Sequence, residues 1–467
     1  MLNKKLFRFI VFWVCVVVSI ITLDSSTQYF QFLFLLPLLY GILFLIVPQF
    51  INGFSLRTPG FLILNIVMMI RYIWLPLALK FGEYHRDGVL QISSSMNFAI
   101  FLMVIELITI GITISVFSKS YNLIKVKNKT LELEPYEKSQ KNFVLFIVLV
   151  ILVLLILTDP STLKTFSFIN IQEDFSLGSN ANASTWSILA ITWFRILFPI
   201  FWIKQCKSMF NKTNLIIWPY IATIIPVLSL LFFSGMSRSS ILIPGLALAL
   251  ILGRTFPAQR TKMYSIIILT ALFSLTVLTI YKSFGTTSTS EGVNLIDFKW
   301  LSNYLEAYFG GVHNVSIAID AKNTFENSIS VNTLLSDLFR SWMGIGEIFR
   351  ANLSTSEYFN IEFYGGYVAF DQVVPTIGSA YMLFGLPGVM IFTIFIVWLV
   401  CKFEQKYKHV NSIELAYLYG FTAVQSAFNL PGNLVILCSF LLNTFIPLLI
   451  IFKLNQLIVS KRKLKKE

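Results

Sequence analysis

The sequence predicts an all-α integral membrane protein of about twelve transmembrane helices, with one long segment between the ninth helix and the tenth. Its composition, the lengths of its apolar runs and the positions of its basic residues together predict this fold class. Of the 467 residues, 56% are hydrophobic and 13% are charged, whereas an ordinary soluble chain carries about 25% charged residues. The composition therefore excludes a soluble globular domain.

The apolar runs have lengths close to those that a bilayer requires. A hydrocarbon core of about 30 Å is crossed by about 20 apolar residues in helical form. The runs fall at residues 6–23, 29–50, 60–81, 97–117, 142–158, 186–203, 214–234, 239–253, 264–281, 380–401, 413–428 and 434–453. Because every backbone polar group must be hydrogen-bonded within lipid, we expect these runs to be helices.

The basic residues orient the chain across the membrane. When the N-terminus is placed inside and the runs alternate, 25 of the 36 Lys and Arg residues fall in inner segments. The largest groups are six lysines between Lys119 and Lys141 and six basic residues between Lys453 and Lys466. Cytoplasmic loops are enriched in Lys and Arg, so both termini are predicted to be cytoplasmic. The net charge of +13 then reflects topology and does not indicate nucleic-acid binding.

Residues 282–379 form the largest predicted extracytoplasmic segment, called the long segment below. It separates a membrane domain at residues 1–281 from a second membrane domain with a basic cytoplasmic tail at residues 380–467. Two of its stretches, LSNYLEAYFGGVHNVSIAID and VNTLLSDLFRSWMGIGEIFR, place apolar residues on one face at helical spacing. We expect amphipathic helices that lie on the outer leaflet and cover a cavity.

The inner segments contain no motif for binding a nucleotide, and the cysteines show no metal-ligand spacing. A Gly-rich phosphate loop and a dinucleotide fingerprint are both absent. The four cysteines lie in apolar runs or at their cytoplasmic edges. We therefore expect no cofactor and no metal site, and we expect any chemistry to take place in the membrane or at its outer face.

Four ionisable residues interrupt the apolar runs, where charge is costly. They are Arg71, Glu106, Arg195 and Arg238, and an Arg at mid-span costs about 2.5–3.5 kcal/mol on insertion scales. A structural explanation exists for each: Arg71 can pair with Glu106, Arg195 can bind carbonyl groups near Pro199, and Arg238 can lie in a loop. The functional alternative is an outward-facing cavity lined by Arg, whose planar guanidinium group binds phosphate oxygens in pairs.

Three stretches of the chain resemble the bacterial oligosaccharide repeat-unit polymerases, the Wzy-type O-antigen and capsule polymerases. They are RYIWLPL at residues 71–77, FFSGMSRSSILIPGLAL at residues 232–248, and the long segment from NYLEAYFGGVHN to PTIGSAYMLFGLPGV. The resemblance implies a glycosyltransferase of the bacterial inner membrane that moves a growing glycan from undecaprenyl pyrophosphate onto the next lipid-linked repeat unit. It implies no nucleotide sugar and no metal, and it adds a chain-length regulator protein as a partner.

The resemblance also implies site residues. Arg71 and Arg238 match arginines that line the pyrophosphate site of the family. From charge and position alone we add Arg195, Arg340 and Arg350 as candidates for the same site.

A second requirement is a base that removes the proton of the acceptor hydroxyl group. In the long segment the first candidates are His313, Glu306 and Asp371, followed by Asp337 and Glu347. His313 is favoured because the unperturbed pKa of histidine lies near neutrality. A packing or surface histidine remains the alternative.

Two other functions fit the same features. A flippase or exporter of lipid-linked oligosaccharide would also have a basic cavity and twelve spans, and an O-antigen ligase-like enzyme would use the same donor with a different acceptor. Transporters commonly consist of two similar halves, whereas here 98 residues are concentrated in one outer segment. The long segment therefore favours an enzyme with a lid.

Overall fold

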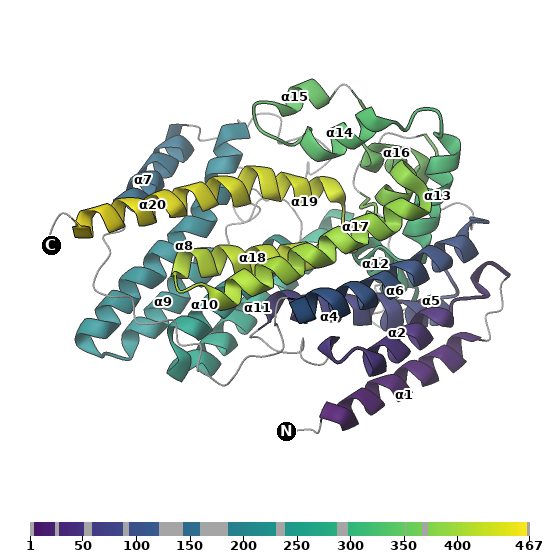
Figure 1. Cartoon of the computed structure of the whole chain (residues 1–467), viewed down its shortest axis with the longest axis horizontal. Coiled ribbons are helices and arrows are strands. Elements are labelled where there is room, and N and C mark those ends of the chain that lie inside the picture. Colours follow the sequence, from purple (N-terminus) through teal and green to yellow (C-terminus); the bar gives the residue numbers. More distant parts are fainter. Residues whose placement is uncertain are drawn as a thin grey trace. The chain divides into compact units, whose positions relative to one another are not determined.

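The structure is a computed structural model in which helices form almost all of the described chain (Figure 1). It describes residues 4–23, 28–50, 58–86, 93–120, 143–158, 185–229, 239–286, 298–350, 352–366 and 372–464. No strand occurs in these ranges. The predicted all-α class is therefore confirmed for the part of the chain that is described.

The chain divides into two compact units, each assembled from separate stretches of sequence. The first unit contains residues 1–127, 292–405 and 423–440, and the second contains residues 128–291, 406–422 and 441–467. Most of the long segment belongs to the first unit, with the first four candidate spans of the chain. Each unit is described by itself below.

Seven of the described helices are long and apolar enough to cross a membrane, or eight if one bent pair is counted as a span. They are Lys5–Leu23, Gln28–Ile46, Pro59–Phe81, Met96–Phe117, Leu189–Thr213, Thr376–His409 and Leu434–Ile458, and the bent pair is Leu242–Thr255 with Pro257–Ser274. The runs predicted at 142–158, 214–234 and 413–428 form helices of 16, 13 and 16 residues. The described lengths of these three helices are below the roughly 20 residues of a full crossing, and the first helix on both sides and the second at its end border residues outside the described part of the chain.

The first unit holds the N-terminal spans and the helices of the long segment. Its elements are α1 (Lys4–Leu23), η1 (Gln28–Phe30), α2 (Leu35–Ile46), α4 (Pro59–Met69), the π-helical turn η2 (Ile70–Trp74), α5 (Leu75–Phe81), α6 (Met96–Ser120), α12 (Phe298–Phe309), α13 (Val312–Thr324), α14 (Val331–Phe339), α15 (Gly346–Phe349), α16 (Thr355–Phe363), most of α17 (Thr376–His409), the end of α18 (Ile413–Phe428) and α19 (Leu434–Phe440).

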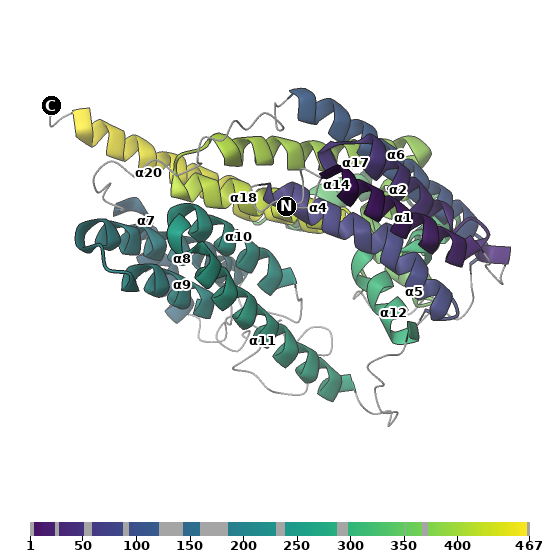
Figure 2. The same cartoon turned by 90° about the horizontal axis from the view of Figure 1, so that it is seen from below.

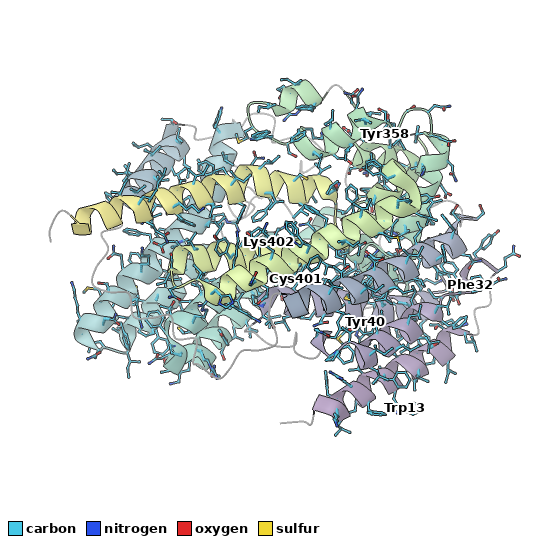
Figure 3. The ribbon with its side chains drawn as sticks, in the orientation of Figure 1. Trp13, Phe32, Tyr40, Tyr358, Cys401 and Lys402 are labelled. Carbon is cyan, nitrogen blue, oxygen red and sulfur yellow. The ribbon has the colours of Figure 1, made fainter. Side chains whose placement is uncertain are left out.

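Aromatic side chains pack the inner faces of the N-terminal helices. Tyr40 of α2, labelled in Figure 3, is buried and lies 6.0 Å from Phe44 and 6.3 Å from Tyr72 between ring centroids. Trp13 of α1, also labelled, is 59% exposed, as expected for a side chain that faces lipid. In lipid, helix association depends on packing of this kind, because both the protein surface and the acyl chains are apolar.

The third span, made of α4, η2 and α5, contains a π-helical turn for a reason visible in the sequence. Pro76 has no backbone N–H and cannot donate to a carbonyl one turn earlier. Just before it, the N–H of Leu75 donates to the carbonyl of Ile70, five residues earlier. This turn of the helix therefore contains one residue more than an α-helical turn. The turn carries Arg71, which is fully buried.

The first patterned stretch of the long segment forms a helical hairpin. Gly310 lies between α12 and α13 with φ at 55°, a left-handed conformation that glycine adopts without strain. A side chain there would also meet Pro375 and the carbonyl of Pro431 at 2.8 Å. The amphipathic pattern runs straight through this position, so the sequence did not predict the break.

Helix α12 runs antiparallel to α5 and packs directly on it (Figure 2). A Cβ atom added at Gly82, just after α5, would lie 2.8 Å from the carbonyl oxygen of Phe298. At the other end of the pair, Leu75 lies beside Gly311, just after α12. The buried face of α12 consists of Ser302, Asn303 and Glu306, so this helix brings polar groups onto the third span.

Two further helices of the first unit are interrupted. Helix α17 is bent at Gly385, where φ is 66°, two residues before Pro387. Residues 429–433, which include Pro431, separate α18 from α19, and the Pro431 carbonyl lies against the α12–α13 turn as described above. Non-helical backbone at membrane depth is tolerated where it is buried in protein. The break at Pro431 lies beside the end of α12, and the bend at Gly385 lies near Lys322 of α13.

The second unit contains the bent helix pair and the C-terminal helix. Its elements are α7 (Phe143–Thr158), α8 (Thr185–Thr213), α9 (Ile217–Ser229), α10 (Ser239–Thr255), η5 (Pro257–Gln259), α11 (Arg260–Thr286), the first part of α18, the π-helical turn η6 (Leu441–Phe445) and α20 (Ile446–Leu464).

Basic side chains of this unit bond to the ends of helices α17 and α18. Arg254, at the end of α10, donates to the carbonyls of Tyr407 at 2.7 Å and Val410 at 3.2 Å. These carbonyls lie at the C-terminal end of α17, where a cation is favourable. Lys204 of α8 forms a buried ion pair with Glu414 of α18. Basic residues predicted at the cytoplasmic edge therefore stabilise helix ends.

Candidate functional site: a buried charged cluster in the first unit

The buried Arg71 side chain forms an ion pair with Glu106 of α6. Its Nη1 atom lies 2.9 Å from Oε1 of Glu106, and the hydroxyl group of Tyr72 donates to Oε2 at 2.6 Å. Arg71 and Glu106 are both 0% exposed, so the structure shows the pairing that was the structural alternative for Arg71. The Nε and Nη2 atoms of Arg71 have no hydrogen-bond partner among the described residues. The ion pair therefore leaves guanidinium donors for a second anionic group.

Glu306 is the second buried carboxyl group of this region. Its side chain is 0% exposed, and neither carboxyl oxygen has a hydrogen-bond partner in the described part of the chain. The position that a Cβ atom would take at Gly311 lies 2.5 Å from both Oε1 of Glu306 and Cδ1 of Leu75. The carboxyl group therefore lies between the start of α13 and the start of α5, one turn beyond Arg71.

The surroundings of Glu306 favour its protonated form. Burial raises the pKa of its carboxyl group to about 7, against the opposing effects of Arg86, of the backbone amides of His313 and Asn314, and of Arg71. A group with a pKa near the working pH is suited to take up and release protons. Glu306 is thus better matched to acid–base chemistry than an exposed glutamate.

His313 is held in one orientation by the backbone. Its Nε2 atom lies 3.1 Å from the carbonyl oxygen of Tyr84, and because a carbonyl can only accept, Nε2 carries the proton. Burial and the charge of Arg86 lower the pKa of the imidazole to about 3. This differs from the near-neutral pKa that favoured His313 as the base, because the ring is 1% exposed. His313 is therefore neutral and weakly basic.

Arg86 belongs to the cluster, although no pattern in the sequence singles it out. It is 7% exposed, and its Nη2 atom donates to Oε1 of Gln372 at 3.0 Å. Its guanidinium group also lies 5.4 Å from the ring centroid of Phe363. In the sequence Arg86 is an ordinary loop residue after α5, and only the packing of the long segment over that loop buries it.

Two predicted arginines of the long segment are engaged elsewhere. Arg340 forms an ion pair with Glu357, whose carboxyl group also accepts from the N–H of Ser354 at 2.7 Å at the start of α16. Arg350 pairs with Glu347, and both side chains are more than half exposed. These contacts stabilise the α14–α16 region and do not assign either arginine to an anion site.

The acidic candidate Asp337 also has a structural role. It accepts from the N–H of Thr355 at 2.9 Å and from its hydroxyl group at 2.7 Å, which caps the start of α16. Burial raises the pKa of Asp337 to about 6. Its two oxygens are already occupied, in contrast to those of Glu306.

The remaining candidates lie in the second unit or outside the described residues. Arg195 is a half-buried residue of α8 with Tyr417 of α18 as a neighbour. Arg238 and Asp371 both lie outside the described residues. Of the predicted site residues, the structure therefore brings together Arg71, Glu306 and His313.

The cluster combines a cation that has spare donors with a carboxyl group that has spare acceptors. It can hold an anion at Arg71 and exchange a proton at Glu306. In the described part of the chain, no group of three or more His, Cys, Asp and Glu side chains could hold a metal ion. Comparisons of the chain with protein families, with characterised proteins and with solved structures give no match.

Proposed function

We propose that the protein polymerises undecaprenyl-pyrophosphate-linked oligosaccharide repeat units into O-antigen or capsular polysaccharide. One observation carries this proposal: the unpartnered donors of Arg71 and the unpartnered carboxyl group of Glu306 lie in one buried cluster. The cluster forms where α12 of the long segment packs on the third span. Such a site fits a reaction with a pyrophosphate leaving group and an acceptor hydroxyl group.

The proposed reaction assigns one role to each charged group. The bond between the anomeric carbon and a pyrophosphate oxygen breaks, and the acceptor oxygen forms a new bond to that carbon. Arg71 stabilises the negative charge that the leaving pyrophosphate gains. Glu306 takes the proton that the acceptor hydroxyl loses, so charge and atoms balance. Arg195, Arg238 and Asp371 remain candidates for contacts with the lipid-linked substrates.

The topology proposed for this function has twelve spans and places both termini in the cytoplasm of a bacterial cell. The long segment then lies at the outer face of the inner membrane, where the site would meet substrate. The concentration of Lys and Arg in the inner segments supports this orientation. In this topology the short apolar helices α7, α9 and α18 would also cross the membrane, packed against neighbouring helices.

The proposal is tested by substitutions at Arg71 in cells that depend on this gene for polymer. Arg71→Ala should abolish polymer and leave single repeat units, and Arg71→Lys should restore little, because an ammonium group lacks the guanidinium fork. Arg71→Lys is the more informative variant, since Arg71→Ala leaves Glu106 as an unpaired buried charge, which costs about 3–5 kcal/mol of stability.

The matched control is Arg350→Ala, which removes an exposed arginine of the same unit. It should leave chain length unchanged. Full-length polymer from a normally expressed Arg71→Lys variant would contradict the proposed role of Arg71.

A further inference from the structure

We infer that Glu306 is the internal counter-anion of the cluster, and that binding of an anion at Arg71 is coupled to protonation of Glu306. This inference rests on the proposed function only for the chemical class of the anion, a pyrophosphate diester. It adds a coupling between anion binding and proton uptake, which the proposed reaction does not require.

Without ligand, the charge of the cluster is balanced when Glu306 is ionised. Arg71 and Arg86 contribute two positive charges, Glu106 and ionised Glu306 contribute two negative charges, and His313 is neutral. Arg71 has one carboxylate as its hydrogen-bonded partner, whereas the carboxyl oxygens of Glu306 have no hydrogen-bond partner within the described residues. Glu306 can therefore gain a proton without breaking a contact.

The other charged side chains of α12 and α13 have partners outside the cluster. Helix α12 packs on α5, on η2 and on α13. The remaining charged residues of α12 and α13 are each engaged: Lys299 with Glu83, Asp320 with Ser95, and Lys322 with the Tyr381 carbonyl. The nearest charge on α5 is Lys80, a half-buried cation.

Helix α12 packs on η2, and Arg71 acts electrostatically on the carboxyl group of Glu306, so an anion bound at the donors of Arg71 would act on the same carboxyl group. A nearby like charge disfavours ionisation, so the anion raises the pKa of Glu306 further above its already raised value near 7. By linkage, protonation of Glu306 must strengthen anion binding by the same factor. With the donor bound, Glu306 can take the acceptor's proton only at pH values where its carboxyl group is ionised, so the coupling shifts the active range of pH upward.

The test measures the affinity of an anion whose own charge does not change with pH. A pyrophosphate esterified with farnesyl on one phosphorus and methyl on the other has no group that titrates between about pH 5 and about pH 9. Its binding to the full-length protein in lipid nanodiscs is measured by calorimetry in buffers of different ionisation enthalpy. Affinity should fall by up to tenfold per pH unit above about pH 7, with uptake of up to one proton.

Two variants make the result specific. Glu306→Gln should bind the diester with an affinity that no longer depends on pH and that exceeds the wild-type affinity at pH 8.5. Glu347→Gln removes an exposed carboxyl group and should retain the wild-type dependence. An affinity of the wild type that is constant across the range, or an unchanged slope in Glu306→Gln, would overturn the coupling.

The same titration separates failure of the inference from failure of the proposed function. Binding without pH dependence would contradict only the coupling. No binding of the diester at any pH would contradict the anion site itself, and with it the proposed role of Arg71.

Discussion

At the scale of single residues, the chemistry of the cluster depends on how much each ionisable group has lost its water. Glu306 and His313 are both buried, and burial shifts both pKa values toward the neutral form, upward for the carboxyl group and downward for the imidazole. The pKa of Glu306 is thereby raised to near neutrality, while the pKa of His313 is lowered to well below neutrality. The residue type alone favoured histidine as the base, and the surroundings favour glutamate.

Replacing Glu306 by Gln should lower the rate of glycan transfer by about 10²–10⁴, the usual contribution of a general base. On saturating donor the wild-type rate should rise with pH and level only above about 7, because only the ionised carboxyl group can accept a proton and the bound anion raises its pKa further. The variant should lack this rise. Rates measured from pH 5.5 to pH 9 on saturating donor would show it, and a Glu306→Gln variant with the wild-type profile would exclude Glu306 as the base.

Some residues of the site could be predicted from sequence and others could not. The Arg71–Glu106 pair was foreseeable, because two opposite charges in neighbouring apolar spans are costly unless they meet. The role of Arg86 could not be predicted, because its burial depends on Gln372 and Phe363, almost 300 residues away in the chain. A loop arginine carries no local pattern that distinguishes such a contact.

At the scale of elements, the site depends on the close approach of α12, α13 and α5. Apolar periodicity predicted the helices of the long segment, because it reports which face of a helix is buried. It did not predict their ends. The turn at Gly310 follows from backbone conformation and from the nearby Pro375, and the π-helical turn at Arg71 follows from the missing N–H of Pro76. Only tertiary packing shows that these breaks meet.

Gly311→Ala should reduce glycan transfer strongly while the protein still folds. The new methyl group would lie 2.5 Å from the Glu306 carboxyl oxygen and from Leu75, so the carboxyl group must move. Activity and thermal stability of the purified variant would be measured together. The control is Gly111→Ala in α6, where the nearest atom is a terminal methyl group of Leu43 that can rotate away. Equal activity in both variants would show that the position of Glu306 does not matter.

At the scale of the whole molecule, the sequence predicted the class of protein better than the number of crossings. Each of the twelve apolar runs coincides with helix, yet seven or eight described helices meet the length and apolarity of a span. Hydropathy shows that a run prefers lipid, but it does not show whether a short helix such as Ile217–Leu228 crosses fully or stops within the bilayer. The orientation proposed from the positions of Lys and Arg assumes that all twelve runs cross, so it depends on this count.

The proposed orientation predicts which cysteine substitutions a membrane-impermeant reagent can reach. Cysteine at Glu347, an exposed position of the long segment, should be labelled from the outer face of intact cells whose outer membrane has been opened. Cysteine at Lys212, an exposed position at the end of α8, should be labelled only after the inner membrane is also opened. The native cysteines Cys15, Cys206 and Cys401 are buried and should react little. The reverse pattern would invert the topology.

The most direct test of the central claim is an assay of glycan length with the purified protein in lipid vesicles. Synthetic undecaprenyl-pyrophosphate repeat units are supplied on one face, without nucleotide sugar or ATP, and products are resolved by size. We predict glycans of two or more repeat units with the wild-type protein and single units with the Arg71→Lys variant. Movement of the repeat units to the opposite face with no change in their length would contradict the polymerase and identify a flippase instead.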